Sequence, residues 1–126
     1  MSHFTTINTQ VRDLDALRDA CRELDLPVEE QADARGYGSQ TRRGELVIRI
    51  PSGPYDIALN HQPDGTYELA TDWWGGQVEQ AVGPNYGRLL QLYGVHKATR
   101  EARRKGLLVR RTRRQDGAIK LTIGGV

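Results

Sequence analysis

The chain has 126 residues, with 18 Lys and Arg against 16 Asp and Glu, and its mean hydropathy is −0.62. This length predicts a single domain over residues 1–126, and no apolar run approaches the about 18 residues of a membrane-spanning helix. The one cysteine, Cys21, excludes an internal disulfide, and the chain begins with neither a basic nor an apolar stretch. We therefore expect a globular cytoplasmic protein with no membrane association.

The small net charge of +2 hides an uneven distribution of charge along the chain. Residues 1–96 carry 8 Arg and no Lys against 14 Asp and Glu, whereas residues 97–126 carry 10 Lys and Arg against only Glu101 and Asp116. The last quarter of the chain is therefore a basic segment joined to an acidic body. Such a segment either serves an anionic partner or neutralises the acidic body within the fold.

The first three predicted elements are a strand, a helix and a short strand. Residues 4–11 alternate like a half-exposed strand and are rich in Thr, Val and Ile. Asp13 then begins a helix whose apolar residues recur at spacings of three and four, and this helix ends near Pro27. The polar stretch 28–44, which Gly36 and Gly38 interrupt, predicts only a short strand followed by a loop.

Five more strands and a second helix follow. Residues 45–50 form an apolar strand signal between Gly and Pro residues. Residues 55–60 and 66–72 flank a Pro-Asp-Gly turn that favours antiparallel pairing, and residues 73–76 end this hairpin. The second helix is expected over residues 86–104, with Gly106 as its stop. Residues 107–113 and 118–123 then form a last hairpin around residues 115–117.

The predicted order of elements is β-α-β-β-β-β-α-β-β. Short Asp-Gly connections join antiparallel strands and are too short for parallel crossovers, so the sheet should be largely antiparallel. The two helices then cover one face of that sheet. This is an α+β fold, and the order of elements allows a ferredoxin-like core.

Several short motifs, spread over nearly the whole chain, stand in the order of one known family. They are Met1-Ser2-His3-Phe4, Val11-Arg12-Asp13-Leu14-Asp15-Ala16-Leu17, Arg35-Gly36-Tyr37, Gln40-Thr41, Tyr55-Asp56-Ile57, Tyr67-Glu68-Leu69, Tyr93 with His96, and Asp116-Gly117-Ala118-Ile119-Lys120-Leu121. In these motifs the chain resembles the hypothetical chloroplast reading frame thirty-five family of cyanobacteria and plastids. The resemblance implies an uncharacterised small protein without an established activity, cofactor or catalytic residue set.

One candidate site combines two histidines and a tyrosine. The histidines are far apart in sequence and have no second ligand at a metal-binding spacing, so we expect no metal. Tyr93 lies one helical turn before His96, and the resemblance carries both together with His3 at the first strand. If the second helix packs across that strand, these three residues line one pocket for a ligand or partner. The alternative is that His96 is a core-edge residue bonded to the backbone.

Trp73 and Trp74 form a second candidate site. Adjacent residues at the end of a strand point in opposite directions, so the two rings cannot both face the same core. We expect one of them to be exposed. The exposed ring serves either as a contact for a partner protein or flat ligand, or only as a cap on the edge of the sheet.

The basic segment is a candidate for binding nucleic acid through phosphates. No aromatic residue, which a stacking platform for bases would need, occurs in residues 97–126. A solvated or internally paired charged face is the alternative. The candidate residues are Arg103, Arg104, Lys105, Arg110, Arg111, Arg113 and Arg114.

No set of nucleophile, base and orienting group accompanies these candidates, and we expect neither catalytic residues nor a cofactor. The sequence therefore favours a non-enzymatic cytoplasmic binding or accessory module that acts through a protein partner or small ligand. Its site would comprise Trp73 and Trp74 together with the pocket around His3, Tyr93 and His96. The alternative function is nucleic-acid binding by the Arg-rich last hairpin.

Overall fold

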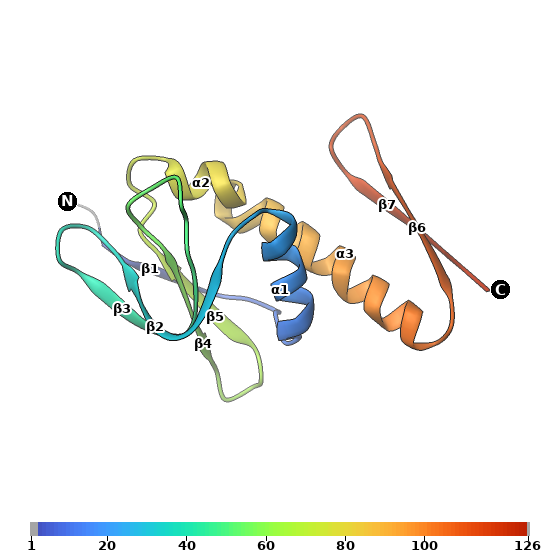
Figure 1. Cartoon of the computed structure of the whole chain (residues 1–126), viewed down its shortest axis with the longest axis horizontal. Coiled ribbons are helices and arrows are strands. Elements are labelled where there is room, and N and C mark those ends of the chain that lie inside the picture. Colours follow the sequence, from blue (N-terminus) through green and yellow to red (C-terminus); the bar gives the residue numbers. More distant parts are fainter. Residues whose placement is uncertain (1–2, 126) are drawn as a thin grey trace.

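The computed structural model describes residues 3–125, and Figure 1 shows them as two parts, a sheet with helices against it and a hairpin that projects beyond the last helix. The strands are β1 (Thr5–Asn8), β2 (Val28–Arg35), β3 (Thr41–Ile48), β4 (Ile57–His61), β5 (Tyr67–Thr71), β6 (Leu108–Arg113) and β7 (Ile119–Gly124). The helices are α1 (Leu14–Glu23), α2 (Gln77–Val82) and α3 (Gly87–Arg104), with a 3-10 turn at Pro84–Tyr86. The predicted order of strands and long helices is confirmed, and the fold is α+β.

The first five strands form one sheet in the order β1-β5-β4-β3-β2, in which every neighbouring pair is antiparallel. Leu46, Leu59 and Leu69 lie in register across three adjacent strands and give one face of the sheet its apolar character. The helices pack on this face. The ferredoxin-like core is not formed, because in that fold one strand separates the two strands of each split βαβ unit, whereas β1 lies at an edge of the sheet and three strands separate it from β2.

The main core lies between this face of the sheet and the helices. Asp13 caps α1 as expected, because its Oδ1 accepts a hydrogen bond of 3.1 Å from the backbone N–H of Ala16. One stripe of α1 and one of α3 are buried against the strands and against each other. Large core side chains with almost no exposed area include Leu17, Ile48, Ile50, Ile57, Leu59, Leu69, Val78, Val82, Tyr86 and Leu89.

β2 is much longer than the short strand that the sequence predicted. It runs over eight residues and pairs with β3 along its length. Gln31 interrupts its regular geometry with φ of 48°. Val28 packs against the main core, whereas Ala34 packs with Val47 and Ala58 in a second small cluster on the other face of the sheet. The strand therefore curls around the sheet, and its polar sequence reflects its exposed outer edge.

The sequence does not predict the short helix α2, because residues 73–76 indicate only the end of the preceding hairpin. Gly76 has φ of 83° and leads directly into the helix. Val78 and Val82 lie one turn apart and are both buried, but a helix of six residues is too short to show a clear period. Within residues 3–125, no helix combines the length and the apolar character that crossing a membrane requires.

The β6–β7 hairpin is a separate two-stranded sheet. It follows α3 and stands away from the five-stranded sheet (Figure 1). None of the residues in its two strands is buried. The predicted last hairpin is therefore confirmed, but it contributes little to the core.

Candidate binding site

The densest charged cluster outside the sheet lies where α1, α3 and β6 meet. Glu23, the last residue of α1, accepts two hydrogen bonds from Arg111, of 2.9 and 2.5 Å, and its Oε1 lies 2.8 Å from Nε2 of His96. Asp19, one turn earlier, accepts hydrogen bonds of 2.5 and 3.1 Å from Arg100. We call these five residues the Glu23 cluster. It joins three elements that are far apart in the sequence.

Both carboxylates of this cluster are ionised at neutral pH. Hydrogen bonds from Arg111 are the main cause that lowers the pKa of Glu23 to about 2; burial opposes this effect and His96 adds to it. The hydrogen bond from Arg100 is the main cause that lowers the pKa of Asp19. Each carboxylate already accepts hydrogen bonds from an arginine. The cluster therefore holds α1, α3 and β6 together, and neither carboxylate is free to act in proton transfer.

An open hollow of about 770 Å³ lies beside the Glu23 cluster. Its walls come from α1 and α3, and four guanidinium groups line it together with two carboxylates. This volume falls within the range of small-molecule sites, about 300–1,000 Å³. The lining residues are Asp19, Arg22, Glu23, His96, Thr99, Arg100, Arg103 and Arg104.

Few contacts fasten the β6–β7 hairpin to the rest of the chain. The pair between Arg111 and Glu23 joins β6 to α1. At the other end, Nε2 of Gln91 donates a hydrogen bond of 3.3 Å to the carbonyl oxygen of Gly117. Ile119 packs against the margin of the main core. These contacts hold one face of the hairpin toward the helices.

The remainder of the hairpin is open. Leu108 is 63% exposed and Ile123 is 46% exposed, and they are two of the five large apolar side chains that the described chain leaves exposed. β6 and β7 pair only with each other, so the outer edge of each strand has no neighbouring strand within residues 3–125. Such free edges are places where a further strand can add.

The three residues expected to form a pocket are not brought together. His3 is exposed and directly precedes β1, which belongs to the five-stranded sheet on the side of the molecule away from the hairpin (Figure 1). The hydroxyl of Tyr93 accepts hydrogen bonds from the backbone N–H groups of Arg12 and Asp13, at 3.0 and 3.1 Å. His96 belongs to the Glu23 cluster. The predicted pocket does not form because α3 packs on α1 and not across β1. Tyr93 therefore has a structural role, and only His96 of the three residues lines a hollow.

The two tryptophans differ in exposure, as expected. Trp73 packs against the main core and meets Tyr86 edge-on, with ring centroids 4.8 Å apart. Trp74 is 67% exposed, and its backbone N–H donates a hydrogen bond of 3.0 Å to Oδ1 of Asp72. Only Trp74 is therefore open to a partner.

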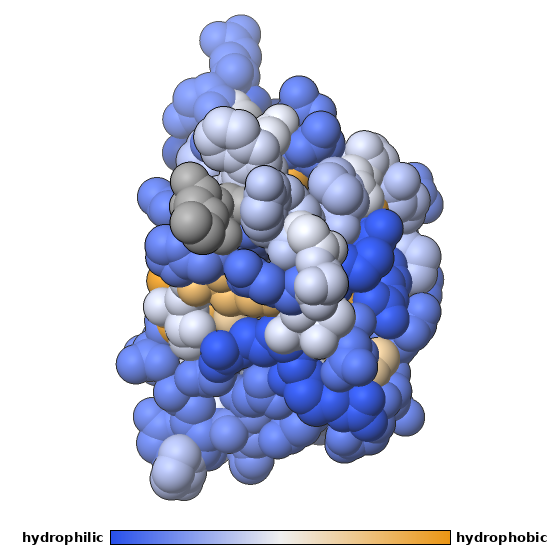
Figure 2. Space-filling view, turned by 90° about the vertical axis from the view of Figure 1, so that its left-hand side faces the viewer, coloured by the Kyte–Doolittle hydropathy of each residue, from blue (hydrophilic) through white to orange (hydrophobic). Residues whose placement is uncertain are grey.

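The basic segment is partly neutralised by the body and partly free. Arg111 faces α1 and pairs with Glu23, while Arg110, the preceding residue of β6, points to the opposite face of the hairpin. Figure 2 shows that the end of the molecule opposite the hairpin is also mainly hydrophilic, with one recessed apolar strip. Among the described residues, six of the candidates form no ion pair: Arg103, Arg104, Lys105, Arg110, Arg113 and Arg114.

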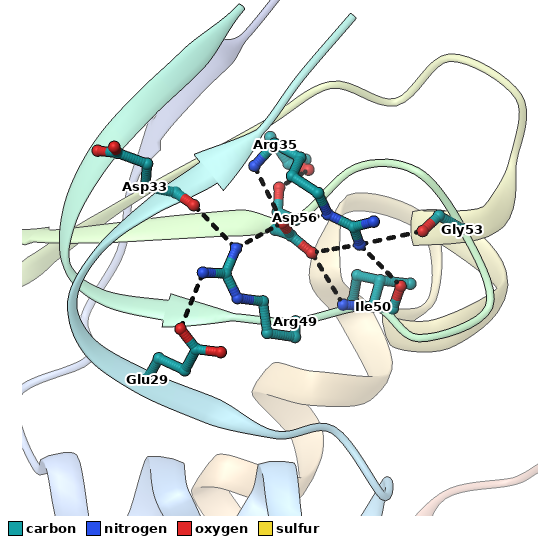
Figure 3. Close-up of polar contacts among 8 residues, drawn as sticks. Glu29, Asp33, Arg35, Arg49, Ile50, Gly53 and Asp56 are labelled. Atoms are coloured by element: carbon teal, nitrogen blue, oxygen red, sulfur yellow. Dashed lines mark hydrogen bonds and ion pairs between the residues drawn. The ribbon is translucent and has the colours of Figure 1, made fainter. Parts of the chain in front are cut away.

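Asp56, just before β4, is the centre of a second ionic cluster that the sequence did not reveal (Figure 3). Its side chain is 0% exposed and accepts five hydrogen bonds of 2.8 to 3.2 Å, from the side chains of Arg35 and Arg49 and from the N–H groups of Arg35 and Ile50. Burial raises its pKa, but these bonds hold the pKa below its usual value. Arg49 also pairs with Glu29 at 2.9 Å. The cluster ties the curled β2 to the segment before β4.

Two further features of the sequence do not form a reactive site. Cys21 is buried, and burial raises the pKa of its thiol to about 12, so the thiol stays protonated at neutral pH. The glycine-rich turn after β2 lines a smaller hollow of about 320 Å³, but the guanidinium of Arg35 there is already bound to Asp56. Within residues 3–125, no three His, Cys, Asp or Glu side chains are placed to hold a metal ion.

The fold and these surfaces define a small α+β protein whose open features are a basic hairpin and a charged hollow. A family model described as "Protein of unknown function (DUF1257)" matches residues 20–122, and the chain belongs to this family. The match covers the Asp56 cluster, the Glu23 cluster and the hollow except for Asp19, and most of the hairpin. No curated protein and no solved structure matches the chain.

Proposed function

We propose that this protein is a non-enzymatic binding module whose β6–β7 hairpin receives an acidic strand of a partner protein. The observation that carries the proposal is the free outer edge of each hairpin strand. Such an edge offers backbone N–H and C=O groups to an added strand. A two-stranded hairpin is marginally stable in water, and a third strand stabilises it.

The charge of the hairpin supports an acidic partner. Arg110, Arg113, Arg114 and Lys120 have no ion pair among the described residues, and Asp116 is the one acidic residue after Glu101. An acidic strand beside β6 or β7 pairs with basic side chains of that edge, and it covers part of the exposed apolar surface of the hairpin. Complementary charge of this kind raises the association rate and selects the partner.

The ionic clusters support binding and not catalysis. The carboxylates of Asp19, Glu23 and Asp56 each accept hydrogen bonds from at least one arginine, so none of them is poised as a free general base. Cys21, the one thiol of the chain, is buried. The open surfaces are the hairpin, the hollow and Trp74.

The test is partner recovery from a lysate of the source cells with the tagged full chain. Arg110→Glu with Lys120→Glu reverses two charges on the outer face of the hairpin, and Arg43→Glu with Arg88→Glu is the matched control on the body. We expect the hairpin variant to recover about tenfold less partner, whereas the control recovers as much as the wild type. Equal recovery by both variants contradicts the proposal.

Crosslinking locates the contact in the same experiment. A photoreactive amino acid at position 108 should capture the recovered partner, because Leu108 is exposed on the hairpin. The same group at position 37 is the control, since Tyr37 is 47% exposed but lies on the turn after β2. Capture at position 37 and not at position 108 contradicts a hairpin interface.

Trp74 is the second contact that we propose, because a partly exposed tryptophan is a frequent anchor of protein interfaces. It lies on the body and not on the hairpin, so it serves either the same large partner or a different one. Trp74→Ala in the recovery experiment decides this point. Loss of the same partner indicates one extended interface, and full recovery removes Trp74 from the proposed site.

Nucleic-acid binding is the second candidate function. It is favoured by the six basic side chains near the end of α3 and on the hairpin that have no ion pair among the described residues. Titration with labelled RNA and DNA at two salt concentrations tests it, because each neutralised phosphate adds to the salt dependence of binding. Affinity that falls steeply with salt supports this function, and no salt-dependent binding excludes it.

We also propose the finer family assignment and a cytoplasmic location. The order of the short motifs supports membership of the chloroplast reading frame thirty-five family of cyanobacteria and plastids. The single cysteine, which is buried and reduced, supports a reducing compartment. Fractionation of the source cells with a tagged chain tests the location, and recovery in a secreted fraction contradicts it.

A further inference from the structure

We propose that the hollow between α1 and α3 binds a phosphate-bearing anion through Arg22, Arg103, Arg104 and the hydroxyl of Thr99. This inference is independent of the hairpin interface. It names a site on the two long helices and a class of ligand for it.

The charges that line the hollow do not cancel. Arg100 neutralises Asp19, and Arg111 of the hairpin neutralises Glu23 from outside the lining. Three guanidinium groups of the lining then remain without a bidentate partner: Arg22, Arg103 and Arg104. Arg22 makes one contact of 3.1 Å with Asp19, and its side chain is 77% exposed.

The cationic groups come from both helices. Thr99 and Arg103 are four residues apart on α3 and lie on one face of it, with Arg104 beside them. Arg22 lies on α1, which packs against α3, so cationic groups face the hollow from both walls. A guanidinium binds a phosphate with two parallel N–H···O bonds, and opposite walls can hold one phosphate group between them.

The partial negative charges of the helix ends oppose the binding of an anion. The hollow lies near the C-terminal ends of α1 and α3, and each end carries about half a negative charge. Three uncompensated guanidinium groups exceed these two partial charges. The net field in the hollow therefore favours an anion.

The lining also limits the kind of ligand. It contains no Phe, Tyr, Trp or large aliphatic side chain, and its one ring, the imidazole of His96, is held against Glu23 with 2.8 Å between Nε2 and Oε1, so it offers little surface on which a base could stack. Recognition therefore rests on the phosphate. Its source is either a small phosphorylated molecule or the backbone of a nucleic acid, and these two sources share the same chemistry.

Calorimetric titration of the full chain with pyrophosphate tests the site. We expect saturable binding that weakens with added salt. Arg103→Gln with Arg104→Gln should weaken it at least about tenfold, since each lost charge-assisted contact is a large part of the affinity. Arg22→Gln should weaken it from the opposite wall. The matched control, Arg113→Gln with Arg114→Gln, removes the same charge from the hairpin and should bind pyrophosphate like the wild type.

A parallel titration with single-stranded RNA distinguishes the two sources. Tight pyrophosphate binding with weak RNA binding indicates a small phosphorylated ligand. RNA binding that the Arg103 and Arg104 variant weakens more than the Arg113 and Arg114 control indicates a nucleic-acid backbone held in the hollow. The proposal is overturned if pyrophosphate does not bind saturably, or if both double variants lose the same affinity for it. Neither outcome bears on partner capture by the hairpin, so the two proposals fail separately.

Discussion

The five-stranded body and the β6–β7 hairpin are built from the same kind of antiparallel pairing but differ in what surrounds them. In the body, side chains such as Ile57 and Leu69 are 0% exposed between the sheet and the helices. In the hairpin, no strand residue is buried, and the strands have only each other as neighbours. Burial of apolar area is the main stabilising contribution in folding. The body therefore carries the stability of the fold, and the hairpin contributes little to it.

The two ionic clusters repeat this contrast. Asp56 lies between the guanidinium groups of Arg35 and Arg49, and Glu23 lies between the guanidinium of Arg111 and the imidazole of His96. The side chain of Asp56 is 0% exposed, whereas that of Glu23 is 31% exposed. Water screens the Glu23 cluster and not the Asp56 cluster, so removing the carboxylate should reduce stability much more at Asp56 than at Glu23.

Asp56→Ala should produce the largest effect. The substitution removes the acceptor of five hydrogen bonds and leaves Arg35 and Arg49 facing a buried site without their carboxylate. We expect the free energy of unfolding to fall by about 3 kcal/mol, as for other broken buried pairs. Urea denaturation followed by circular dichroism measures it. Glu29→Gln is the control because Glu29 is exposed, and a loss in that variant equal to the loss in Asp56→Ala would contradict the central role of Asp56.

Tyr93→Phe should have the next largest effect. The phenol oxygen accepts hydrogen bonds from two backbone N–H groups at the start of α1, and phenylalanine leaves both without this acceptor. We expect a loss of about 1–2 kcal/mol in the free energy of unfolding. The same denaturation experiment measures it. A variant as stable as the wild type would show that water replaces the hydroxyl and that Tyr93 does not fasten α3 to α1.

Glu23→Gln should act on the hairpin and hardly on the body. It breaks the pair with Arg111, whose two side chains are about one-third exposed, so the global loss should stay below about 1 kcal/mol. Amide signals of β6 and β7 in nuclear magnetic resonance spectra should shift or broaden, while those of β4 and β5 stay in place. Equal changes in both regions would contradict a locally held hairpin.

Acid should reproduce this effect in the wild type. The folded-state pKa of Glu23, about 2, lies below its ordinary value of 4.5, so the unfolded state binds the proton first. The contribution of the pair is therefore complete above about pH 4.5 and is lost as the pH falls toward 2. Hairpin signals should change over this window in the wild type and not in Glu23→Gln. If the hairpin signals of both proteins changed over the same pH range, the change would have to come from another carboxylate.

Trp74→Ala should have the smallest effect on stability. The ring is 67% exposed, and its removal should change the free energy of unfolding by less than about 0.5 kcal/mol. Trp73→Ala is the comparison, because that ring packs against the core and Tyr86. A large loss for Trp74→Ala would mean that its ring is covered in solution.

The elements that the sequence predicted well carry their own signals. The buried stripe of α1 and its Asp13 cap, and the Asp-Gly turns of two hairpins, are local features. The length of β2 was underestimated because its polar residues face solvent or pair with distant charges, and because Gln31 breaks its alternation. An ion pair cannot be predicted from one of its residues when the other is remote in sequence, and Glu23 and Arg111 are 88 residues apart. The phenol of Tyr93 likewise bonds to backbone 80 residues away, which no local pattern can indicate.

Hydrogen exchange of the backbone amides in the full chain tests the contrast between body and hairpin most directly. The account predicts that amides of β6 and β7 exchange at least about 100-fold faster than those of β4 and β5, because opening the hairpin does not disturb the main core. If the hairpin binds an acidic strand, as we propose, a recovered partner should slow exchange in the hairpin alone. Protection of the hairpin equal to that of β4 and β5 in the isolated chain would contradict the claim that the hairpin opens independently of the main core.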